Sequence, residues 1–425
     1  MADYGTRVTL LQKTAPPYNV PMRILRTLFR RARGRVYLDY AAATPVDSSV
    51  AALVDSLARS QTGNPGAAHA EGRSARAILD AARADVARSI HAAADEVVFT
   101  SGGTEANNLA ILGHVRALRA RGTPYESMHV LVSAIEHSSV RALAIELKRL
   151  GVSVTDIPVT EAGLVEPEAV RKLLTERTVL VSVMLANNEI GTVQPVRAIA
   201  RAVRAYTAAH HSSRITVHTD ASQAPLFLPV DVRSLGVDLL TLDGQKVYGP
   251  RGVGCIFRRR GVPLAPVLLG GGQETGLRPG TENVVLVGGF ARALTLADTG
   301  RARLVRHTSA LHKLFLERLA ARVPQAVVNG SITERVPGNV NISIPGFDGE
   351  FLSVCLDEEG IAVTSKSACL GHGTEGSSVV YALGVGEARA RGTLRFSFGR
   401  ETRPRDIRRA VDSLAYLVAK FDKGV

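Results

Sequence analysis

The stretch EVVFTSGGTEANNLAILGHV, residues 96–115, changes from one backbone periodicity to another within a few residues. Its start is rich in β-branched and aromatic residues and predicts a strand, whereas a helical pattern begins at about Thr104. Gly102 and Gly103 lie between the two. Backbone N–H groups at a helix N-terminus attract anions, and Ser and Thr hydroxyls add donors. The stretch therefore fits an ordinary strand-to-helix turn or a phosphate-binding loop.

The same alternation of strand and helix continues along the chain. Short apolar, β-branched runs predict strands at 96–100, 129–133, 152–157, 179–185, 215–220, 239–242 and 254–257. Helical patterns lie between them at 72–90, 106–121, 140–150, 167–174 and 196–210. This order predicts an α/β fold, with a mainly parallel seven-stranded sheet covered by helices on both faces.

The chain divides into three expected regions. Residues 1–35 form a basic leader, and residues 50–298 form the large domain. After about residue 298 a long helical stretch is followed by strands near 340–344 and 394–398 and by a final helix. Residues 36–49 together with 299–425 are therefore expected to form a smaller α+β domain.

Hydropathy and cysteine usage exclude several classes of protein. No apolar run is long enough to span a bilayer, so we expect no membrane association. The three cysteines, Cys255, Cys355 and Cys369, are too few and too scattered for a disulfide framework or a CxxC metal site. We therefore expect no metal and a reducing compartment, the cytoplasm.

The positive charge is concentrated at the N-terminus. The net charge is +13, and the eight basic residues before Val36, less Asp3, contribute +7 of it. The remaining chain is only mildly basic, so we expect no nucleic-acid partner. The leader is compatible with a basic surface-seeking helix, a flexible segment, a transit peptide, or a start site placed upstream of Met22.

Two further residues follow predicted strands. Asp220 ends the run 215–220, and Lys246 follows the run 239–242 among glycines. Asp220 could cap a helix or pair with a buried cation, and Lys246 could be a surface residue or a buried amine nucleophile. Pyridoxal 5′-phosphate (PLP) needs such a lysine, a carboxylate for its pyridine nitrogen, and a phosphate-binding helix N-terminus. The three features occur in this order in the chain. This favours a phosphate-binding loop, an Asp220 that pairs with a cation, and a Lys246 that acts as a nucleophile.

Six motifs resemble one known family. They are TSGGTEANN (100–108), EH (136–137), MLANNEIGTVQP (184–195), HTDASQA (218–224), QKVYGPRGVG (245–254) and GGGQETGLRPGTEN (270–283). In this order they resemble the cysteine desulfurase / selenocysteine lyase family of fold-type-I PLP enzymes, which are class-V aminotransferase-like. The resemblance runs from about Val36 to about Gly399.

The resemblance implies a role for each matched residue. Lys246 would hold PLP covalently, Asp220 would keep the pyridine nitrogen protonated, and His137 would stack on the ring and shuttle protons. Gln223 would bond the phenolate oxygen, and Asn188 would contact cofactor and substrate. Gly103 and Thr104 would hold the phosphate. The resemblance also implies a homodimer, in which Thr281 of a second subunit reaches that phosphate.

Substrate roles follow from the same resemblance. Arg395 would clamp the carboxylate of L-cysteine, for which a guanidinium fork is suited. Cys369 lies in the small, polar, glycine-rich stretch TSKSACLGHG (364–373), whereas Cys255 and Cys355 lie in apolar runs typical of core packing. Cys369 would accept the sulfur as a persulfide and pass it to a sulfur-acceptor or iron–sulfur scaffold protein. The implied pathway is iron–sulfur cluster assembly or tRNA thiolation.

Three positions depart from the family pattern. Gln245 stands where a histidine is usual, Asp243 where a small serine is usual, and Pro279 where serine is more common. An aspartate beside a phosphate adds like-charge repulsion. Its side chain would turn away, be protonated, or lower cofactor affinity. Asp243 thus leaves a catalytically weakened or silent relative as one alternative. The others are a selenocysteine lyase, because the resemblance implies the same scaffold, and a nucleic-acid binder that uses the basic leader.

Overall fold

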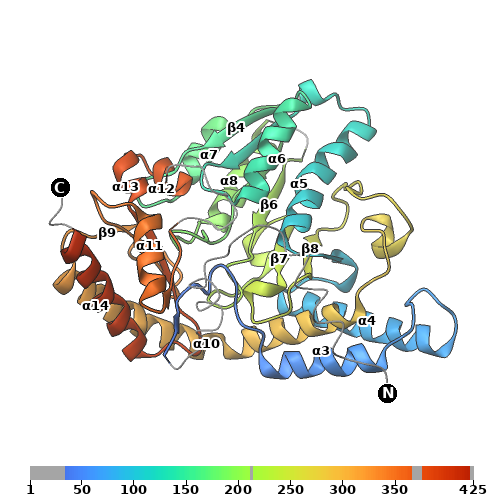
Figure 1. Ribbon diagram of the computed structural model, residues 1–425. Coiled ribbons are helices and arrows are strands. Elements are labelled where there is room, and N and C mark those ends of the chain that lie inside the picture. The colour runs from blue at the N-terminus through green and yellow to red at the C-terminus, as the bar shows by residue number, and fades with distance from the viewer. Residues whose placement is uncertain (1–33, 211–213, 366–375, 422–425) are drawn as a thin grey trace, which may run out of the picture.

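A seven-stranded sheet forms the centre of the computed structural model, which describes residues 34–210, 214–365 and 376–421 (Figure 1). The strand order across the sheet is β2-β8-β7-β6-β5-β3-β4. The bounds are β2 Val97–Thr100, β3 His129–Ser133, β4 Ser153–Ile157, β5 Thr178–Ser182, β6 Thr216–Asp220, β7 Leu239–Asp243 and β8 Gly254–Arg258. The predicted α/β class and all seven predicted strands are confirmed.

Parallel pairing dominates the sheet, as expected. β4, β3, β5, β6 and β7 pair in parallel, whereas β8 runs antiparallel to both of its neighbours, β7 and β2. Gly254 of β8 lies opposite Thr100 of β2 on one side and Asp243 of β7 on the other. The reversed strand therefore fixes the distance between the ends of β2 and β7.

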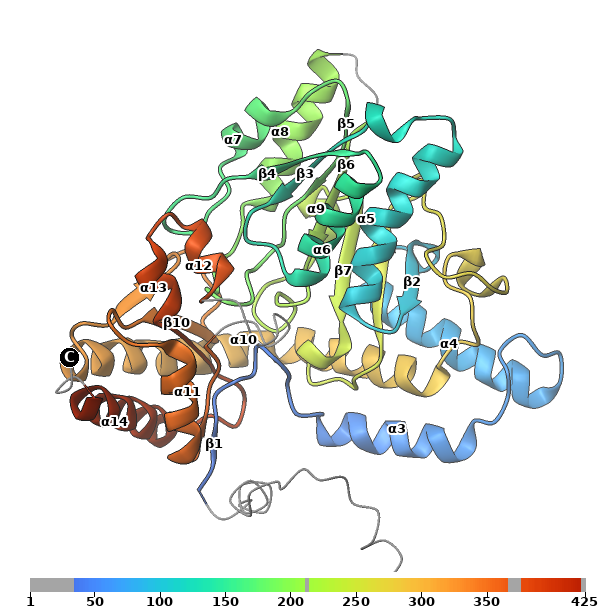
Figure 2. The same cartoon turned by 45° about the horizontal axis from the view of Figure 1, so that its top comes forward.

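Helices cover both faces of the sheet (Figure 2). Their bounds are α3 Ser48–Ser60, α4 Ala70–Ser89, α5 Gly103–Ala120, α6 Ser138–Arg149, α7 Pro167–Leu173, α8 Val196–Ala209 and α9 Val232–Leu235. Single 3₁₀ turns are η1 Ala94–Glu96, η2 Tyr125–Ser127, η3 Gly244–Lys246 and η4 Gln273–Gly276. Successive residues of β3 point to opposite faces: Val130 packs with α5 and α6, whereas Leu131 packs in the core that includes α4 and α8. Burial on both faces explains why the strands other than the edge strand β4 are mainly apolar in sequence.

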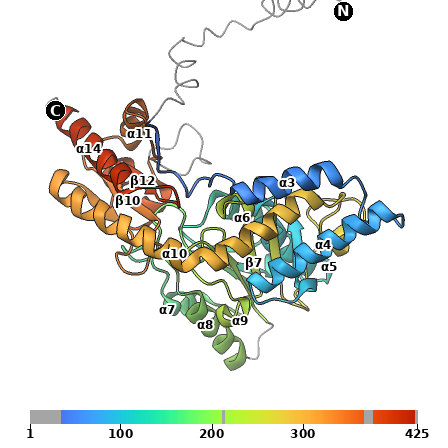
Figure 3. The same ribbon diagram turned by 90° about the horizontal axis from the view of Figure 1, so that it is seen from below.

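A second core lies beside the first. Its elements are β1 Val36–Tyr37, β9 Val327–Asn329, β10 Asn339–Ser343, α11 Gly349–Glu358, β11 Ile361–Ala362, α12 Ser378–Ala382, α13 Glu387–Arg391, β12 Thr393–Ser397 and α14 Pro404–Phe421. β1 pairs with β11, and β10 lies between β12 and β9. The helix α10, Val284–Arg322, runs past α3 and α4 to α14 (Figure 3) and contributes side chains to both cores. The expected boundary at residue 298 falls inside α10, and it stays a prediction.

Functional side chains gather at one edge of the sheet. β6 ends at Asp220, β7 ends at Asp243, and α5 begins at Gly103 directly after β2. His137 is the N-cap of α6, which follows β3. In open α/β sheets ligands bind outside the carboxyl ends of the strands. This edge is therefore where a site is expected.

Two predictions from the sequence concern membranes and the basic leader. Within the described ranges, no helix has the length and apolar character needed to cross a membrane. The basic leader lies almost wholly in residues 1–33, outside the described residues.

Gly254 gives a test of the strand arrangement. A Cβ added there would lie 2.5 Å from the Leu242 carbonyl oxygen and 2.8 Å from the Gly102 carbonyl carbon. Because both are backbone atoms, Gly254→Ala should lower the free energy of unfolding by about 1–3 kcal/mol, measured by denaturant titration. Gly300→Ala in α10 is the control, since its Cβ would meet nothing within 4 Å. That variant should gain up to about 1 kcal/mol, and equal effects of both substitutions would refute the close approach.

Candidate functional site

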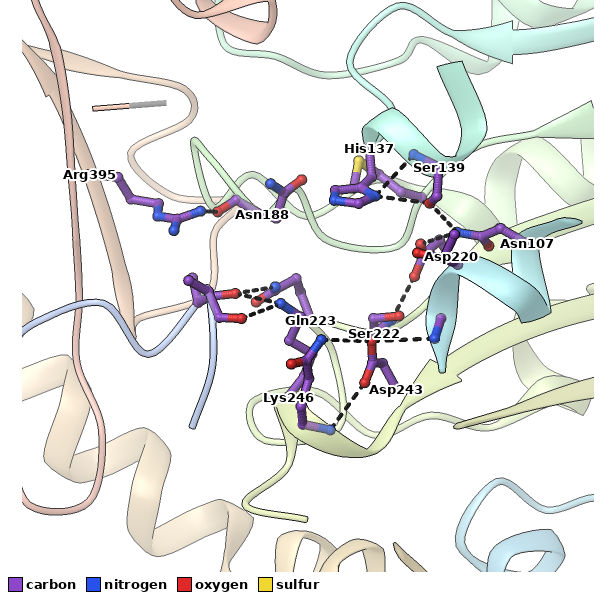
Figure 4. A pocket seen from close by; sticks show the side chains of 16 residues that line it. Asn107, His137, Ser139, Asn188, Asp220, Ser222, Gln223, Asp243, Lys246 and Arg395 are labelled. Carbon is purple, nitrogen blue, oxygen red and sulfur yellow. Dashed lines mark hydrogen bonds between the residues drawn. The ribbon is translucent and has the colours of Figure 1, made fainter. Parts of the chain in front are cut away.

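A cavity of about 280 Å³ opens at the carboxyl edge of the sheet (Figure 4). Every predicted site residue except Thr281 and Cys369 lines it: Gly103, Thr104, His137, Asn188, Asp220, Gln223, Asp243, Gln245, Lys246 and Arg395. Six further residues line it that the sequence did not single out: Ala41, Ala42, Asn107, Ser139, Met184 and Ser222.

The two remaining predicted residues stand apart from the cavity. Thr281 is exposed between η4 and α10 and does not line it. Cys369 falls in residues 366–375, which lie outside the described residues. Cys255 is buried in β8, as expected, and burial raises the pKa of its thiol. Cys355 is only partly buried on α11, so it is less enclosed than the sequence suggested.

A chain of hydrogen bonds fixes Asp220 and His137. The Asn107 side-chain amide donates to Asp220 Oδ2 at 2.8 Å and to Ser139 Oγ at 2.9 Å (Figure 4). The Ser222 backbone N–H donates to Asp220 Oδ1 at 2.9 Å. Both carboxylate oxygens are thus held by neutral donors, which fix the orientation of the side chain.

His137 is oriented from its Nδ1 side. The Ser139 backbone N–H donates to Nδ1 at 3.2 Å, and Ser139 Oγ lies 2.9 Å from the same atom. Nδ1 is therefore an acceptor, which assigns the neutral ring a proton on Nε2. Burial lowers the pKa of His137, although the nearby Asp220 opposes this shift. The residue thus offers a neutral imidazole, with Nε2 left for chemistry.

Lys246 and Gln223 converge on the segment that follows β1. Lys246 Nζ donates to the Ala42 carbonyl at 2.6 Å and to the Ala41 carbonyl at 3.1 Å. Gln223 Nε2 donates to the same Ala41 oxygen at 2.9 Å. Both side chains line the cavity, as do Ala41 and Ala42.

Arg395 reaches the cavity from β12 of the second core. Its Nη1 donates to the Asn188 carbonyl at 2.8 Å, and its Nη2 donates to Asp39 Oδ1 at 2.7 Å. Its Nε is buried and has no hydrogen-bond partner among the described residues, nor has Asn188 Oδ1. A buried donor without a partner is costly, so this edge of the guanidinium suits a carboxylate ligand.

Asp243 does not turn away from the predicted phosphate loop. Its Oδ2 accepts the Gly103 backbone N–H at 3.3 Å, and its Oδ1 accepts the Gln245 backbone N–H at 3.0 Å. The Gln245 side chain also donates to Oδ2, at 3.3 Å. Of the three outcomes expected from the sequence, the one in which the side chain points elsewhere is wrong.

The residues present fit the ring of PLP and the carboxylate of an amino-acid substrate. A lysine amine, a buried carboxylate at a strand end and a neutral histidine share one cavity with an α-helix N-terminus. This donor set matches the aldehyde, the pyridine nitrogen and the phosphate of that cofactor. Ser222 and Thr104 also line the cavity and bring hydroxyl groups.

Sequence reasoning missed Asn107, although the motif TSGGTEANN contains it. A signal was present: Asn107 lies four residues after Gly103 on the expected helix, so it shares the helix face that begins at the loop. Ser139 lies two residues after His137, at the spacing of a residue whose backbone N–H is bound by a helix N-cap. Both residues were identifiable as supports for the predicted site.

Glu136 is buried directly behind the cavity. Its Oε1 accepts hydrogen bonds from Ser133 Oγ at 2.6 Å and from the Met184 backbone N–H at 2.7 Å. Its Oε2 has no partner among the described residues. Burial raises the pKa of Glu136 to about 8 from an ordinary value of 4.5. The carboxyl is therefore neutral at pH 7.

Replacing Glu136 by Gln should flatten the dependence of stability on pH. Between pH 4.5 and about 8 the folded protein holds a proton that the unfolded chain has lost, so stability falls as pH rises. From pH 6 to pH 8 the wild type should lose at most about 2.7 kcal/mol more than Glu136→Gln, measured by urea unfolding at each pH. Exposed Glu166→Gln is the control and should keep the wild-type slope. Parallel slopes for Glu136→Gln and wild type would show that Glu136 is ionised.

Comparisons with known proteins agree with this geometry. The model of a family described as aminotransferase class-V matches residues 36–410. The cysteine desulfurase IscS of Dictyoglomus turgidum is 37% identical over 386 residues, covering 91% of this chain and 95% of that protein. The cysteine desulfurase IscS 1 of Archaeoglobus fulgidus is 36% identical over 391 residues, covering 91% and 97%.

Solved structures give the same result. A NifS-like protein superposes with a TM-score of 0.83 at 30% identity, over 91% of this chain and 100% of the other. A structure of SspA in complex with cysteine gives 0.73 at 31% identity, over 86% and 99%. With the lysine, aspartate and histidine in one cavity at the sheet edge, these matches show that the chain belongs to the aminotransferase class-V family and, within it, to the cysteine desulfurases.

Proposed function

We propose that this cavity binds PLP and L-cysteine, and that sulfur leaves it as a persulfide on Cys369 with release of L-alanine. The observation that carries the proposal is the meeting of Lys246, Asp220, His137 and Arg395 in one cavity. Each residue supplies a different function, and the four come from both cores of the molecule. The solved relative in complex with cysteine supports L-cysteine as the substrate.

PLP, when bound, supplies an electron sink for the substrate carbon atoms. Lys246 would hold it covalently through Nζ, which in the structure donates to the carbonyls of residues 41 and 42. Asp220, fixed by Asn107 and the Ser222 backbone, would pair with the pyridine nitrogen. Gln223 would bond the phenolate oxygen, and the start of α5 with Gly103 and Thr104 would hold the phosphate.

Arg395 and Asn188 orient the substrate. Asp39 and the Asn188 carbonyl hold the guanidinium of Arg395 in place. Its Nε, which has no partner among the described residues, would donate to the substrate carboxylate. His137 moves protons at Nε2, because its Nδ1 is already bound to Ser139. Lys246 is the second group able to move a proton once its amine is free.

Both ends of the Cys369 loop are anchored at the cavity. Thr364 exchanges two backbone hydrogen bonds with Arg395, at 2.7 and 3.3 Å. Ser377 Oγ donates to Glu189, the neighbour of Asn188, at 2.6 Å. Cys369 follows Thr364 by five positions, a span of at most about 18 Å. This anchoring supports Cys369 as the sulfur acceptor.

The sulfur transfer balances without a further reactant. The Cys369 thiolate attacks the substrate sulfur, so an S–S bond forms as the substrate C–S bond breaks. The electron pair of that bond stays on carbon, which takes up a proton and becomes the methyl group of alanine. The transferred sulfur remains on Cys369 as a persulfide, a covalent intermediate that a second protein can attack.

We extend the proposal to two partners. The first is a sulfur-acceptor or iron–sulfur scaffold protein, which the IscS relatives support. The second is another copy of this chain, whose Thr281 would reach the phosphate, and the exposure of Thr281 away from its own cavity is compatible with that role.

Lys246→Ala should remove the covalent cofactor link and abolish turnover, because no other lysine among the described residues lines the cavity. Visible absorbance and borohydride reduction followed by peptide mapping measure the link. Release of alanine and sulfide from the PLP-supplemented protein measures turnover. A mutant that stays yellow through a reducible bond would disprove the assignment of Lys246.

Cys369→Ser should bind L-cysteine and keep the cofactor spectrum, yet carry no persulfide and release no sulfide. Mass spectrometry after a single turnover detects the persulfide. The control is Cys255→Ala with Cys355→Ala, which should keep turnover nearly intact and cost roughly 1–3 kcal/mol of stability. A persulfide on either of those cysteines in the wild type would contradict the role of Cys369.

A further inference from the structure

The Asp243 carboxylate lies where a bound phosphate would find its donors. It accepts the backbone N–H of Gly103, the first residue of α5, and both the backbone and side-chain N–H groups of Gln245. An added Cβ on Gly103 would lie only 3.2 Å from Asp243 Oδ2 and 3.3 Å from Ser222 Oγ. The carboxylate is therefore packed against the start of the helix.

The helix itself makes this position attractive for an anion. α5 has 18 residues, and its N-cap, Gly102, provides no side-chain hydrogen bond. The N-terminal N–H groups of such a helix carry a partial positive charge of roughly half an elementary charge. In the described residues Asp243, from a different strand, supplies the anion that Gly102 cannot.

We propose that Asp243 is an internal competitor of the cofactor phosphate and weakens its hold on the start of α5. The proposal rests on PLP being the cofactor. A phosphate that enters must displace the carboxylate from Gly103 or share the site with it. A carboxylate is only an acceptor, so it repels the phosphate and offers it no hydrogen bond.

Gln245 makes the competition effective. Its side-chain amide and its backbone N–H both donate to Asp243, so two donors beside the phosphate site are already engaged. Serine at position 243 could still cap η3, and it would leave the Gln245 side chain and Gly103 free for the phosphate. Asp243 and Gln245, which both depart from the family pattern, are thus hydrogen-bonded to each other.

A comparison of two ligands isolates the phosphate. PLP and pyridoxal have the same ring and aldehyde, so the ratio of their dissociation constants measures what the phosphate contributes. Asp243→Ser should bind PLP about tenfold more tightly than the wild type, equivalent to about 1.4 kcal/mol, and should bind pyridoxal equally well. Asp243→Asn, which keeps the shape but removes the charge, should show part of the gain.

Equilibrium dialysis of the full-length protein measures both constants without requiring a covalent link. Asp231→Ser is the matched control, because Asp231 caps α9 through two backbone N–H groups in the same manner but does not line the cavity. Its ratio should equal that of the wild type. In the cofactor-free protein, millimolar inorganic phosphate should raise the melting temperature of Asp243→Ser more than that of the wild type.

Two results would overturn the inference. One is an unchanged ratio for Asp243→Ser, and the other is an equal gain for PLP and pyridoxal, which would place the effect at the ring. Absorbance recorded on the same samples tests the proposed function separately. If the PLP-bound samples lack the visible band of the covalent link while Asp243→Ser still changes the ratio of the PLP and pyridoxal dissociation constants, the covalent role of Lys246 is refuted. The competition between Asp243 and the phosphate then still holds.

Discussion

The side-chain amide of Asn107 holds the functional edge of the molecule together. Its two donor hydrogens join Asp220 at the end of β6 to Ser139 on α6, and Ser139 in turn fixes His137. Three elements that are distant in the sequence thus share one buried, neutral donor. Because the interior has a low dielectric constant, such a network specifies one arrangement more strongly than exposed hydrogen bonds would. The positions of the acid and the imidazole depend on it.

The second core completes the site through Arg395. β12 lies beside β10 in that core, and its backbone also pairs with Thr364 at the start of the Cys369 loop. The same residue thus contacts Asp39 after β1, Asn188 after β5 and the entrance of the loop. Two of these three contacts, to Asp39 and to Asn188, join segments more than 200 positions apart in the chain.

Local pattern predicted much of this arrangement. Six of the seven strands were visible because they are buried on both faces, whereas the edge strand β4 is partly exposed. Asp220 and Lys246 followed from their places after strands. The reversal of β8 was not visible, since an antiparallel strand inside a parallel sheet has the same apolar run, VGCIF. The contact of Asp243 with Gly103 joins residues 140 positions apart, so no local pattern could reveal it. Asn107 was missed because a helical asparagine usually faces water.

The single helix α10 has a consequence for how the molecule unfolds. At 1.5 Å per residue its 39 residues span about 58 Å, and its apolar side chains are divided between the two cores. Melting of either core would strip half of that helix of its packing, and a helix in water keeps little stability of its own. Loss of one core therefore removes support from the other. We therefore expect the two cores to unfold as one cooperative unit and partly folded species with one intact core to be rare.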